Sequence, residues 1–274
     1  MADAIEWLLN VTENIETTKS RGSNMEKVGL IGCGYWGSKI LTALDRLPHI
    51  ETIVSTKSGK VSLDTILNDP QIKNVFIATP VQTHYELCRL ALEAGKNVMC
   101  EKNFTETFEQ ALDLYELSSN NGLSIFVDYT YTLNPNLKNN VIPPGAHIAV
   151  LFHQDGRIDE EDTLSMLGSH ALSVAYTLGN LYGADLINSY ATSHYSIQSY
   201  IFPGTVRMDL WCWRRSPSKT RQVFINNKII ELDFENGIDI MVDKFLGGAD
   251  NTDMALEVAH RLDEAREHNE SSNC

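Results

Sequence analysis

The chain has 274 residues, of which 43% are hydrophobic and 21% charged, and its formal net charge is −14. This length allows one large domain or two of ordinary size, and the apolar fraction excludes a disordered protein. The negative charge argues against nucleic acid as a partner, and no apolar run approaches the ~20 residues of a membrane span.

Residues 1–24 differ in character from the rest of the chain. "DAIEWLLNVTENIE" fits a short amphipathic helix and "TTKSRGSN" a flexible linker, so we interpret this segment as an extension. It is acidic and lacks the basic region of a signal peptide. The five cysteines are widely spaced and odd in number, which indicates reduced thiols, no metal site and a cytoplasmic location.

The next hundred residues alternate between strand-like and helix-like runs. The predicted strands are "KVGLIG", "ETIVS", "NVFIAT", "NVMCE" and "LSIFVDY". Capping boxes at Thr83 and Thr107 predict two helices, which end at Gly95 and Gly122. Strands that alternate with helices predict a parallel sheet with right-handed crossovers. The connection between the second and third strands is short, and we expect no helix in it.

Strand-like runs dominate after "NPNLKNNVIPPG" and predict an antiparallel sheet. A helix over residues 162–178 interrupts them, and a last helix places Ala255, Val258, Ala259 and Leu262 on one face. We therefore predict an extension over residues 1–24, a dinucleotide-binding domain over 25–134, and a substrate and oligomerisation domain over 135–274. The last helix is free to pack back on the first domain.

A glycine pattern, Gly32, Gly34 and Gly37, follows the first predicted strand and opens a helix. In this context Gly32 permits a tight turn, Gly34 lets the backbone approach a pyrophosphate, and Gly37 allows close packing of helix on strand. The helix N-terminus then offers free N–H groups to phosphate. A purely structural turn is the alternative.

The end of the second strand bears on the choice of cofactor. An acidic residue usually meets a free ribose 2′-hydroxyl there, but this chain has Ser55, Thr56, Lys57 and Ser58. Hydroxyls and a cation suit a 2′-phosphate, so we predict NADP rather than NAD. A plain polar loop is the alternative interpretation.

The segment "IATPVQTHYELCRLALEAGKNVMCEKN" resembles the glucose-fructose oxidoreductase/inositol dehydrogenase family (Gfo/Idh/MocA). "VDYTYTLNP" and "GSHALSVAYTLG" resemble two further segments of that family, the second of which carries a catalytic histidine there. The resemblance implies a doubly wound Rossmann sheet followed by an α+β domain with an open-faced, mostly antiparallel sheet. It also implies hydride transfer between a nicotinamide cofactor and an alcohol or ketone of a sugar, sugar nucleotide or cyclitol, in a homo-oligomer assembled through the second sheet.

Two residues are the candidate catalytic pair. Lys102 falls just past the fourth strand, where open α/β sheets bind ligands, and its ammonium can stabilise a developing alkoxide. His170 can act as general base or acid near neutral pH. The candidate cofactor-binding residues are Gly32, Gly34, Tyr35, Trp36, Gly37, Ser55, Thr56, Lys57, Thr79, Pro80, His84, Glu101 and Lys102. The candidate substrate-binding residues are Lys102, Tyr129, Tyr131, Met166 and His170.

The chain departs from the family pattern at two site positions. Asn103 replaces the proline that follows the lysine, so we expect Lys102 to be less firmly held. Met166 stands where members have an aspartate, one helical turn before the histidine. Asp162 lies another turn back, about 6 Å further along a helix, and is a doubtful substitute.

Three functions therefore stay open. The first is an NAD(P)-dependent oxidoreductase acting on the CH–OH groups of a sugar-like small molecule. The second is a family member without dehydrogenase activity that binds a ligand or serves as a subunit, which Met166 and Asn103 favour. The third is a reductase that resembles biliverdin reductase.

Overall fold

The computed structural model describes residues 25–59, 61–137, 140, 142–154, 163–179, 181–202, 206–226 and 228–272. The extension 1–24 and Asp162 lie outside these ranges. Within them, no helix has both the length and the apolar character needed to cross a membrane.

Five parallel strands form the first sheet, in the order β2-β1-β3-β4-β5. Their bounds are β1 Glu26–Ile31, β2 Ile50–Ser55, β3 Ile72–Ile77, β4 Asn97–Cys100 and β5 Ile125–Val127. These are the five strands predicted from the sequence. Their apolar runs are nearly continuous because both faces of a parallel sheet are buried.

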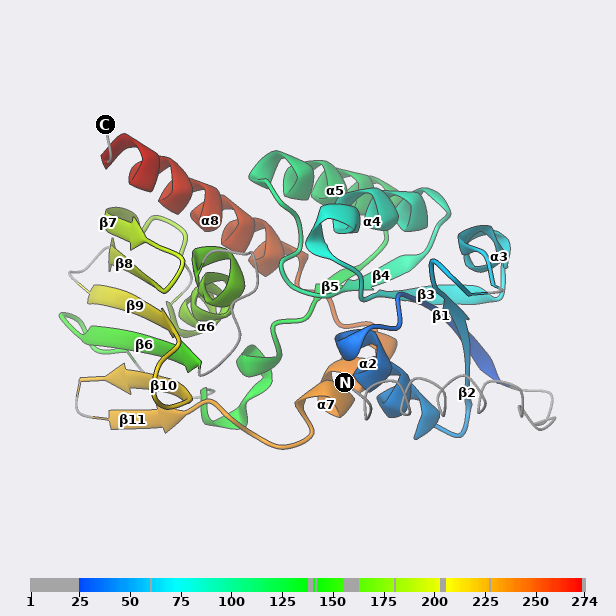
Figure 1. Cartoon of the computed structure of the whole chain (residues 1–274), viewed down its shortest axis with the longest axis horizontal. Coiled ribbons are helices and arrows are strands. Elements are labelled where there is room, and N and C mark those ends of the chain that lie inside the picture. Colours follow the sequence, from blue (N-terminus) through cyan, green and yellow to red (C-terminus); the bar gives the residue numbers. More distant parts are fainter. Residues whose placement is uncertain are drawn as a thin grey trace.

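Helices cover both faces of this sheet (Figure 1). One face packs against α2 (Tyr35–Asp45) and α7 (Gly237–Leu246), and the other against α3 (Leu63–Asn68), α4 (His84–Glu93) and α5 (Phe108–Asn121). A hydrophobic core lies on each face of the sheet, and alternate strand residues belong to one or the other. Leu30 and Phe76 face α2 and α7, whereas Ile31 and Ile77 face the other side.

Two of these helices differ from expectation. The short connection after β2 does contain a helix, α3, whose Ser62 side chain accepts a hydrogen bond from Thr65 N and whose Ile66 is fully buried. Helix α7 comes from the predicted second domain but packs on the first sheet. Its Phe245 ring lies 5.1 Å edge-to-face from Phe76. The expectation of a bare connection was therefore wrong.

Six strands form the second sheet, in the order β11-β10-β6-β9-β8-β7. Their bounds are β6 His147–Gln154, β7 Asp185–Ala191, β8 Tyr195–Phe202, β9 Val206–Arg214, β10 Thr220–Ile225 and β11 Lys228–Glu231. All neighbouring pairs are antiparallel except β6 and β9, which are parallel. The predicted fold class, a Rossmann domain followed by a mostly antiparallel sheet, is confirmed.

Two helices join the sheets. A π-helical turn, Leu164–Gly168, leads into α6 (Ser169–Gly179), whose side chains are buried against the second sheet. Helix α8 (Thr252–Ser272) runs alongside both domains (Figure 1). Its Asp263 accepts a hydrogen bond at 2.6 Å from Phe108 N, at the start of α5. One hydrophobic core consequently extends from the first sheet to the second.

The helix caps agree only in part with the sequence. Thr107 accepts a hydrogen bond from Gln110 N, and α5 ends at Gly122 with φ +63°. Thr83, by contrast, does not cap α4, because a 3₁₀ turn precedes that helix and the Thr83 hydroxyl donates to Thr79 Oγ1 at 2.8 Å. The capping box predicted at Thr83 was wrong.

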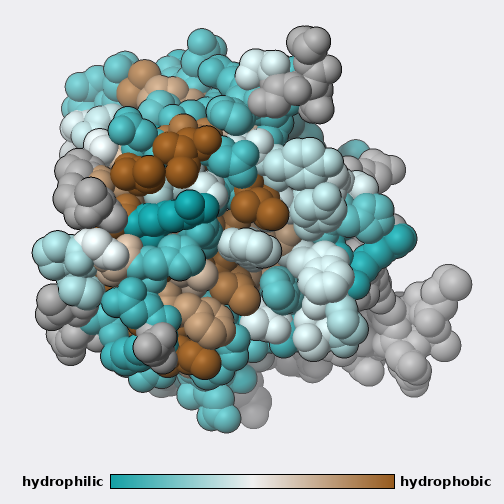
Figure 2. All heavy atoms as spheres, turned by 90° about the vertical axis from the view of Figure 1, so that its left-hand side faces the viewer, coloured by the Kyte–Doolittle hydropathy of each residue, from teal (hydrophilic) through white to brown (hydrophobic). Residues whose placement is uncertain are grey.

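The outer face of the second sheet carries exposed apolar side chains. Figure 2 views the molecule from the side of this sheet and shows hydrophobic patches between hydrophilic ones. The large exposed residues on these strands are Ile187, Tyr190, Tyr195, Ile201, Trp211, Trp213 and Ile229.

Candidate active site

The glycine loop joins β1 to α2 and closes against the end of β3. Gly32 has φ +90°, and a Cβ there would lie 2.4 Å from Ala78 O. A Cβ at Gly37 would lie 2.3 Å from Gly32 O. A Cβ at Gly34 would meet no described heavy atom within 4 Å. Two glycines are therefore required by the turn itself, whereas Gly34 borders open space, as a cradle for a pyrophosphate must.

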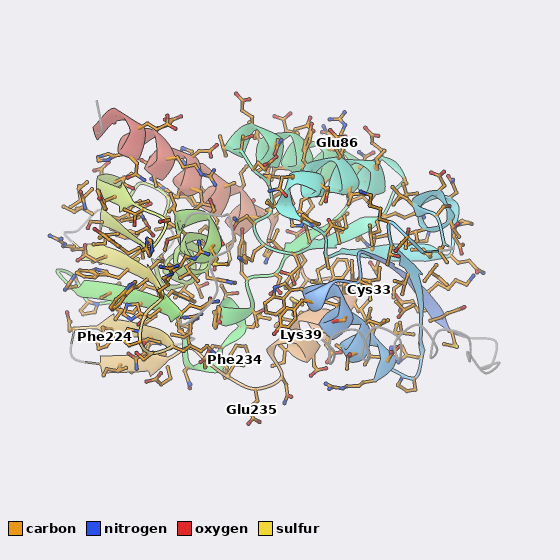
Figure 3. The ribbon with its side chains drawn as sticks, viewed as in Figure 1. Cys33, Lys39, Glu86, Phe224, Phe234 and Glu235 are labelled. Atoms are coloured by element: carbon orange, nitrogen blue, oxygen red, sulfur yellow. The ribbon has the colours of Figure 1, made fainter. Side chains whose placement is uncertain are left out.

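The first turn of α2 presents two aromatic side chains beside this space. Tyr35 is 70% and Trp36 45% exposed, and their rings meet edge-to-face at 5.1 Å. Lys39 Nζ lies 4.3 Å from the Tyr35 ring centroid and 4.5 Å from that of Trp36. Cys33 in the loop and Lys39 on α2 lie near the middle of the molecule (Figure 3). The exposed rings are thus available to a ligand in the cradle.

The end of β2 offers fewer polar groups than predicted. Ser55 is buried, and its hydroxyl donates to Val61 O at 2.9 Å. It therefore braces the loop, and its predicted contact with cofactor is not favoured. Thr56 is half-buried and Lys57 exposed, so these two candidates keep accessible side chains.

Lys102 lies just past β4, at the carboxyl edge of the sheet. It is half-buried, and its Nζ donates to Met166 O in the π-helical turn at 3.0 Å. The next residue, Asn103, is buried and donates from Nδ2 to Ser165 O at 2.7 Å. Asn103 therefore anchors the lysine loop to the second domain, contrary to the expectation that the loss of proline leaves Lys102 loosely held.

His84 has a structural position. It is fully buried, and its ring nitrogens lie 2.7 Å from Asn103 O and 2.8 Å from Thr79 O. His84 thereby links the end of β3 to the end of β4 without facing the cradle. Thr79 and the exposed Pro80 lie next to the glycine loop, since a Cβ at Gly32 would meet Thr79 Cγ2 at 2.7 Å.

His170 lies at the start of α6, packed between aromatic rings. Its ring stacks on Phe152 at 5.8 Å and meets Tyr131 edge-to-face at 5.0 Å. Nδ1 is buried and has no hydrogen-bond partner among the described residues. Burial, followed by the charges of Lys102 and Arg221, holds the pKa of His170 well below its usual value. The imidazole is consequently neutral at physiological pH.

Arg221 on β10 belongs to this site but was not among the candidates. It is buried; Nε donates to Tyr131 Oη at 3.2 Å, and the Cζ atom lies 5.2 Å from the Phe152 ring centroid. Arg221 lies inside a strand that was predicted only from periodicity. Nothing in the sequence around it indicated a function. The arginine orients the Tyr131 hydroxyl beside His170.

The other substrate candidates differ in exposure. Tyr131 and Met166 are half-buried next to the site. Tyr129 is only 2% exposed and packs in the core, which does not favour its predicted contact with substrate. Met166 contributes a backbone carbonyl to Lys102, and its side chain supplies no carboxylate.

Beneath Lys102 lie two buried carboxyl groups, Glu101 and Asp128. Burial raises the pKa of both, that of Glu101 well above its usual value. Glu101 Oε1 is buried and has no hydrogen-bond partner within the described chain. Asp128 was missed, although its place directly after a buried strand was a usable signal.

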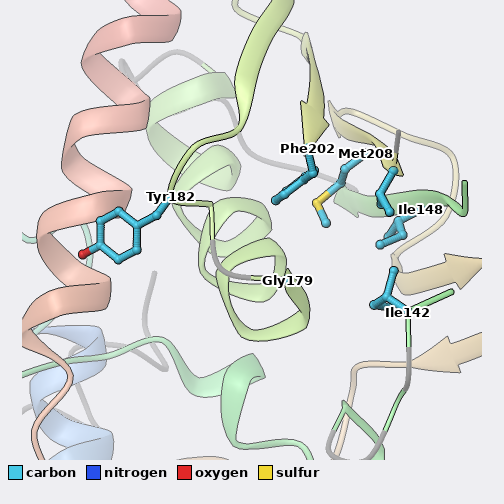
Figure 4. A pocket seen from close by; sticks show the side chains of 7 residues that line it. Ile142, Ile148, Gly179, Tyr182, Phe202 and Met208 are labelled. Atoms are coloured by element: carbon cyan, nitrogen blue, oxygen red, sulfur yellow. The ribbon is translucent and has the colours of Figure 1, made fainter. Parts of the chain in front are cut away.

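A separate apolar cavity of about 360 Å³ lies at the far end of α6 (Figure 4). Gly179, Phe202 and Met208 line it together with Ile142, Ile148, Tyr182 and Val206. His170 begins the same helix at its other end, so this cavity is not the site around Lys102. In the described part of the chain, no cluster of three or more histidine, cysteine or acidic residues is arranged to hold a metal ion.

Residues 48–129 match the oxidoreductase family with an NAD-binding Rossmann fold, GFO_IDH_MocA. Over this range the chain is similar to the Gfo/Idh/MocA family. The match agrees with the resemblance seen in the sequence. The matched range contains β3, β4, Lys102 and β5.

Levoglucosan dehydrogenase of Pseudarthrobacter phenanthrenivorans is 30% identical over 56% of this chain and 47% of its own length. The NADP(+)-dependent scyllo-inositol 2-dehydrogenase IolW of Bacillus subtilis is 32% identical over 37% of this chain and 32% of its own length. The chain thus spans less than half the length of either relative. UDP-N-acetylglucosamine 3-dehydrogenase GnnA from Acidithiobacillus ferrooxidans shares the fold, with a TM-score of 0.76 at 14% identity over 89% of this chain and 98% of its own.

Proposed function

We propose that this chain is an NAD(P)-dependent oxidoreductase that moves a hydride between a nicotinamide cofactor and a secondary alcohol or ketone of a sugar, sugar nucleotide or cyclitol. The observation that carries the proposal is Lys102, fixed at the carboxyl edge of the same sheet that ends in an open glycine cradle. Support also comes from the names of the relatives, which act on levoglucosan, scyllo-inositol and UDP-N-acetylglucosamine.

The nicotinamide supplies the hydride chemistry when bound, and the chain supplies position and charge. The Lys102 ammonium faces the substrate oxygen and stabilises the alkoxide as it develops. The Tyr131 hydroxyl, held by Arg221, offers a further hydrogen bond to the substrate. His170 contributes a neutral ring that packs against Tyr131 and Phe152, and its low pKa disfavours the role of general base at neutral pH.

We further propose that NADP(H) is the preferred cofactor. Thr56 and the exposed Lys57 follow β2, and no acidic side chain stands there to meet a 2′-hydroxyl. The name of IolW, which uses NADP(+), supports this preference.

A second candidate function is ligand binding without dehydrogenase activity. Two observations favour it: Met166 carries no carboxylate, and His170 Nδ1 lacks a hydrogen-bond partner in the described ranges. A binding protein would keep the cradle but would not need an acid or base near the substrate.

The outer face of the second sheet supports the proposal of a homo-oligomer. Trp211 and Trp213 project from β9 beside Tyr195 on β8, all more than 40% exposed. Exposed apolar faces of this kind mark interaction surfaces, and a second copy of this chain is the partner we propose.

The test is a titration of the purified chain with NADPH and NADH, followed by turnover assays on a panel of sugars and cyclitols. We expect NADPH to bind more tightly than NADH. Lys102→Ala should retain cofactor binding but lose on the order of 10²–10³-fold in kcat. Binding of NADPH without turnover of any substrate would favour the second candidate, and failure to bind either cofactor would contradict both.

A further inference from the structure

Glu101 and Asp128 occupy equivalent positions, each directly after one of two neighbouring parallel strands. Cys100 at the end of β4 pairs with Val127 at the end of β5, and Asp128 N donates to Cys100 O at 2.9 Å. The next residue of each strand therefore lies beside its counterpart at the carboxyl edge of the sheet. Both side chains are buried, Glu101 6% and Asp128 4% exposed.

Hydrogen bonds distinguish the two carboxyl groups. Asp128 Oδ1 accepts from Thr130 N at 3.0 Å and from the Thr130 hydroxyl, and the Glu101 carboxyl bonds to Asp128 as well. Three donors suit an ionised Asp128. Glu101 Oε1 has no partner in the described part of the chain, which suits a protonated Glu101 that donates its one proton to Asp128. The pair then holds one proton and one negative charge.

Several titratable groups surround Lys102. Asp128 directly follows β5, His84 belongs to α4 and His170 to α6, while the charge of Arg221 on β10 acts on His170. Burial lowers the pKa of both histidines, and for His84 the carbonyls of Asn103 and Thr79 oppose that shift, so neither ring supplies a negative charge. The carboxyl pair supplies the negative charge that balances the Lys102 ammonium, because Met166 supplies only a carbonyl oxygen.

We propose that Asp128, together with Glu101, is a positioning residue that keeps the Lys102 amine protonated and directed at the substrate oxygen. The proposal rests on the proposed function and deepens it, since it assigns proton donation to Lys102 rather than to His170. In the reducing direction, a bound reduced nicotinamide would supply the hydride, and Lys102 would give its proton to the carbonyl oxygen of the substrate. Solvent returns a proton to Lys102, and the shared carboxyl proton stays in place.

The first test is infrared spectroscopy of the whole chain at pH 7, without cofactor. We expect the carbonyl band of a protonated carboxylic acid, because the other described carboxyl groups with a shifted pKa, Asp69 and Asp209, are shifted downward. The band should disappear in Glu101→Gln, whereas Asp128→Asn should keep it at a shifted frequency, because Glu101 stays buried but its hydrogen-bond acceptor changes. The band should remain unchanged in Asp113→Asn, which alters a solvent-exposed carboxylate paired with Arg89.

The second test is acetylation of Lys102 by acetic anhydride at fixed pH, followed by mass spectrometry. Asp128→Asn removes the negative charge, so Lys102 should react faster, on the order of tenfold, whereas Asp113→Asn should leave the rate unchanged. With substrate, activity in the reducing direction should fall as the pH is raised and Lys102 loses its proton. In Asp128→Asn this fall should occur at a lower pH than in the parent.

Two results would overturn the proposal: no carboxylic acid band at pH 7, or equal acetylation of Lys102 in Asp128→Asn and Asp113→Asn. Because neither measurement needs cofactor or substrate, both stay informative if the chain has no dehydrogenase activity. Failure of the proposed function shows separately, as the absence of NADPH binding or of turnover. If Asp128→Asn does not fold, the parent spectrum and Glu101→Gln still decide the matter.

Discussion

Lys102 and His170 border the same site, yet their surroundings give them different chemistry. Lys102 has a carbonyl at 3.0 Å and the buried carboxyl groups of Glu101 and Asp128 beneath it. His170 has aromatic rings on two sides and two cations nearby. A charge is therefore stabilised on the lysine and disfavoured on the imidazole.

The low pKa of His170 predicts a specific pH dependence of stability. In the unfolded chain its pKa returns to about 6.5, so on acidification the unfolded state binds a proton that the folded state does not. The stability contributed by the neutral ring is present above this pH and lost below it, by up to ~2 kcal/mol at pH 5. His170→Phe, which keeps the aromatic stack, should remove this loss.

Urea unfolding at pH 7 and pH 5 measures the effect. The difference in unfolding free energy between the two pH values should be smaller in His170→Phe than in the parent. His49→Gln, at an exposed histidine, serves as the control and should behave like the parent. An unchanged difference in His170→Phe would show that the ring titrates normally.

At the scale of elements, substitutions in the glycine loop should affect cofactor binding and folding separately. Gly34→Val places its side chain in open space at a residue with φ −77°, so the fold should tolerate it while the pyrophosphate is excluded. NADPH affinity should fall at least ~10-fold, or about 1.4 kcal/mol. The melting temperature should change little.

Gly37→Ala is the matched contrast within the same loop. Its methyl group would lie 2.3 Å from Gly32 O, so this variant should lose ~1–3 kcal/mol of stability through overpacking. Calorimetry and cofactor titration on both variants make the comparison. If Gly34→Val bound NADPH as well as the parent does, the loop would be a turn and not a cradle.

The elements were predictable to different degrees for physical reasons. Each of the first five strands contains a short apolar run, and glycines or helix caps lie between the strands, so periodicity was sufficient. The spacing of Ile238, Met241, Val242 and Phe245 is helical and was a usable signal for α7. Nothing in that spacing specifies which sheet α7 covers, because Phe76 and Phe126 lie more than a hundred residues away.

The site residues were also predictable to different degrees. Lys102 and the glycine loop belong to local motifs and were found from the sequence. Arg221 meets Tyr131 across 90 positions of the chain, and the partner of Asp128 lies on the neighbouring strand. Such contacts arise only when the second sheet packs against α6 and the strand ends align, so composition and spacing could not predict them.

At the scale of the whole molecule, the two sheets use their faces differently. Both faces of the first sheet are covered by helices, whereas α6 covers only the inner face of the second. The outer face of the second sheet keeps Trp211 47% and Trp213 42% exposed. Burying such aromatic side chains removes a large apolar area from water, which gives self-association through this face a driving force.

Trp211→Glu tests the proposed assembly. A carboxylate in the centre of an apolar interface would be buried without a partner, at a cost that opposes association, while on a free face it would be solvated and harmless. Light scattering coupled to size-exclusion chromatography should find the parent as an oligomer and Trp211→Glu as a monomer with unchanged circular dichroism. Leu90→Glu, on the exposed side of α4, should leave the mass of the parent unaltered. An oligomer that survives Trp211→Glu would place the contact elsewhere, and a parent that is monomeric at tens of micromolar would contradict the proposed assembly.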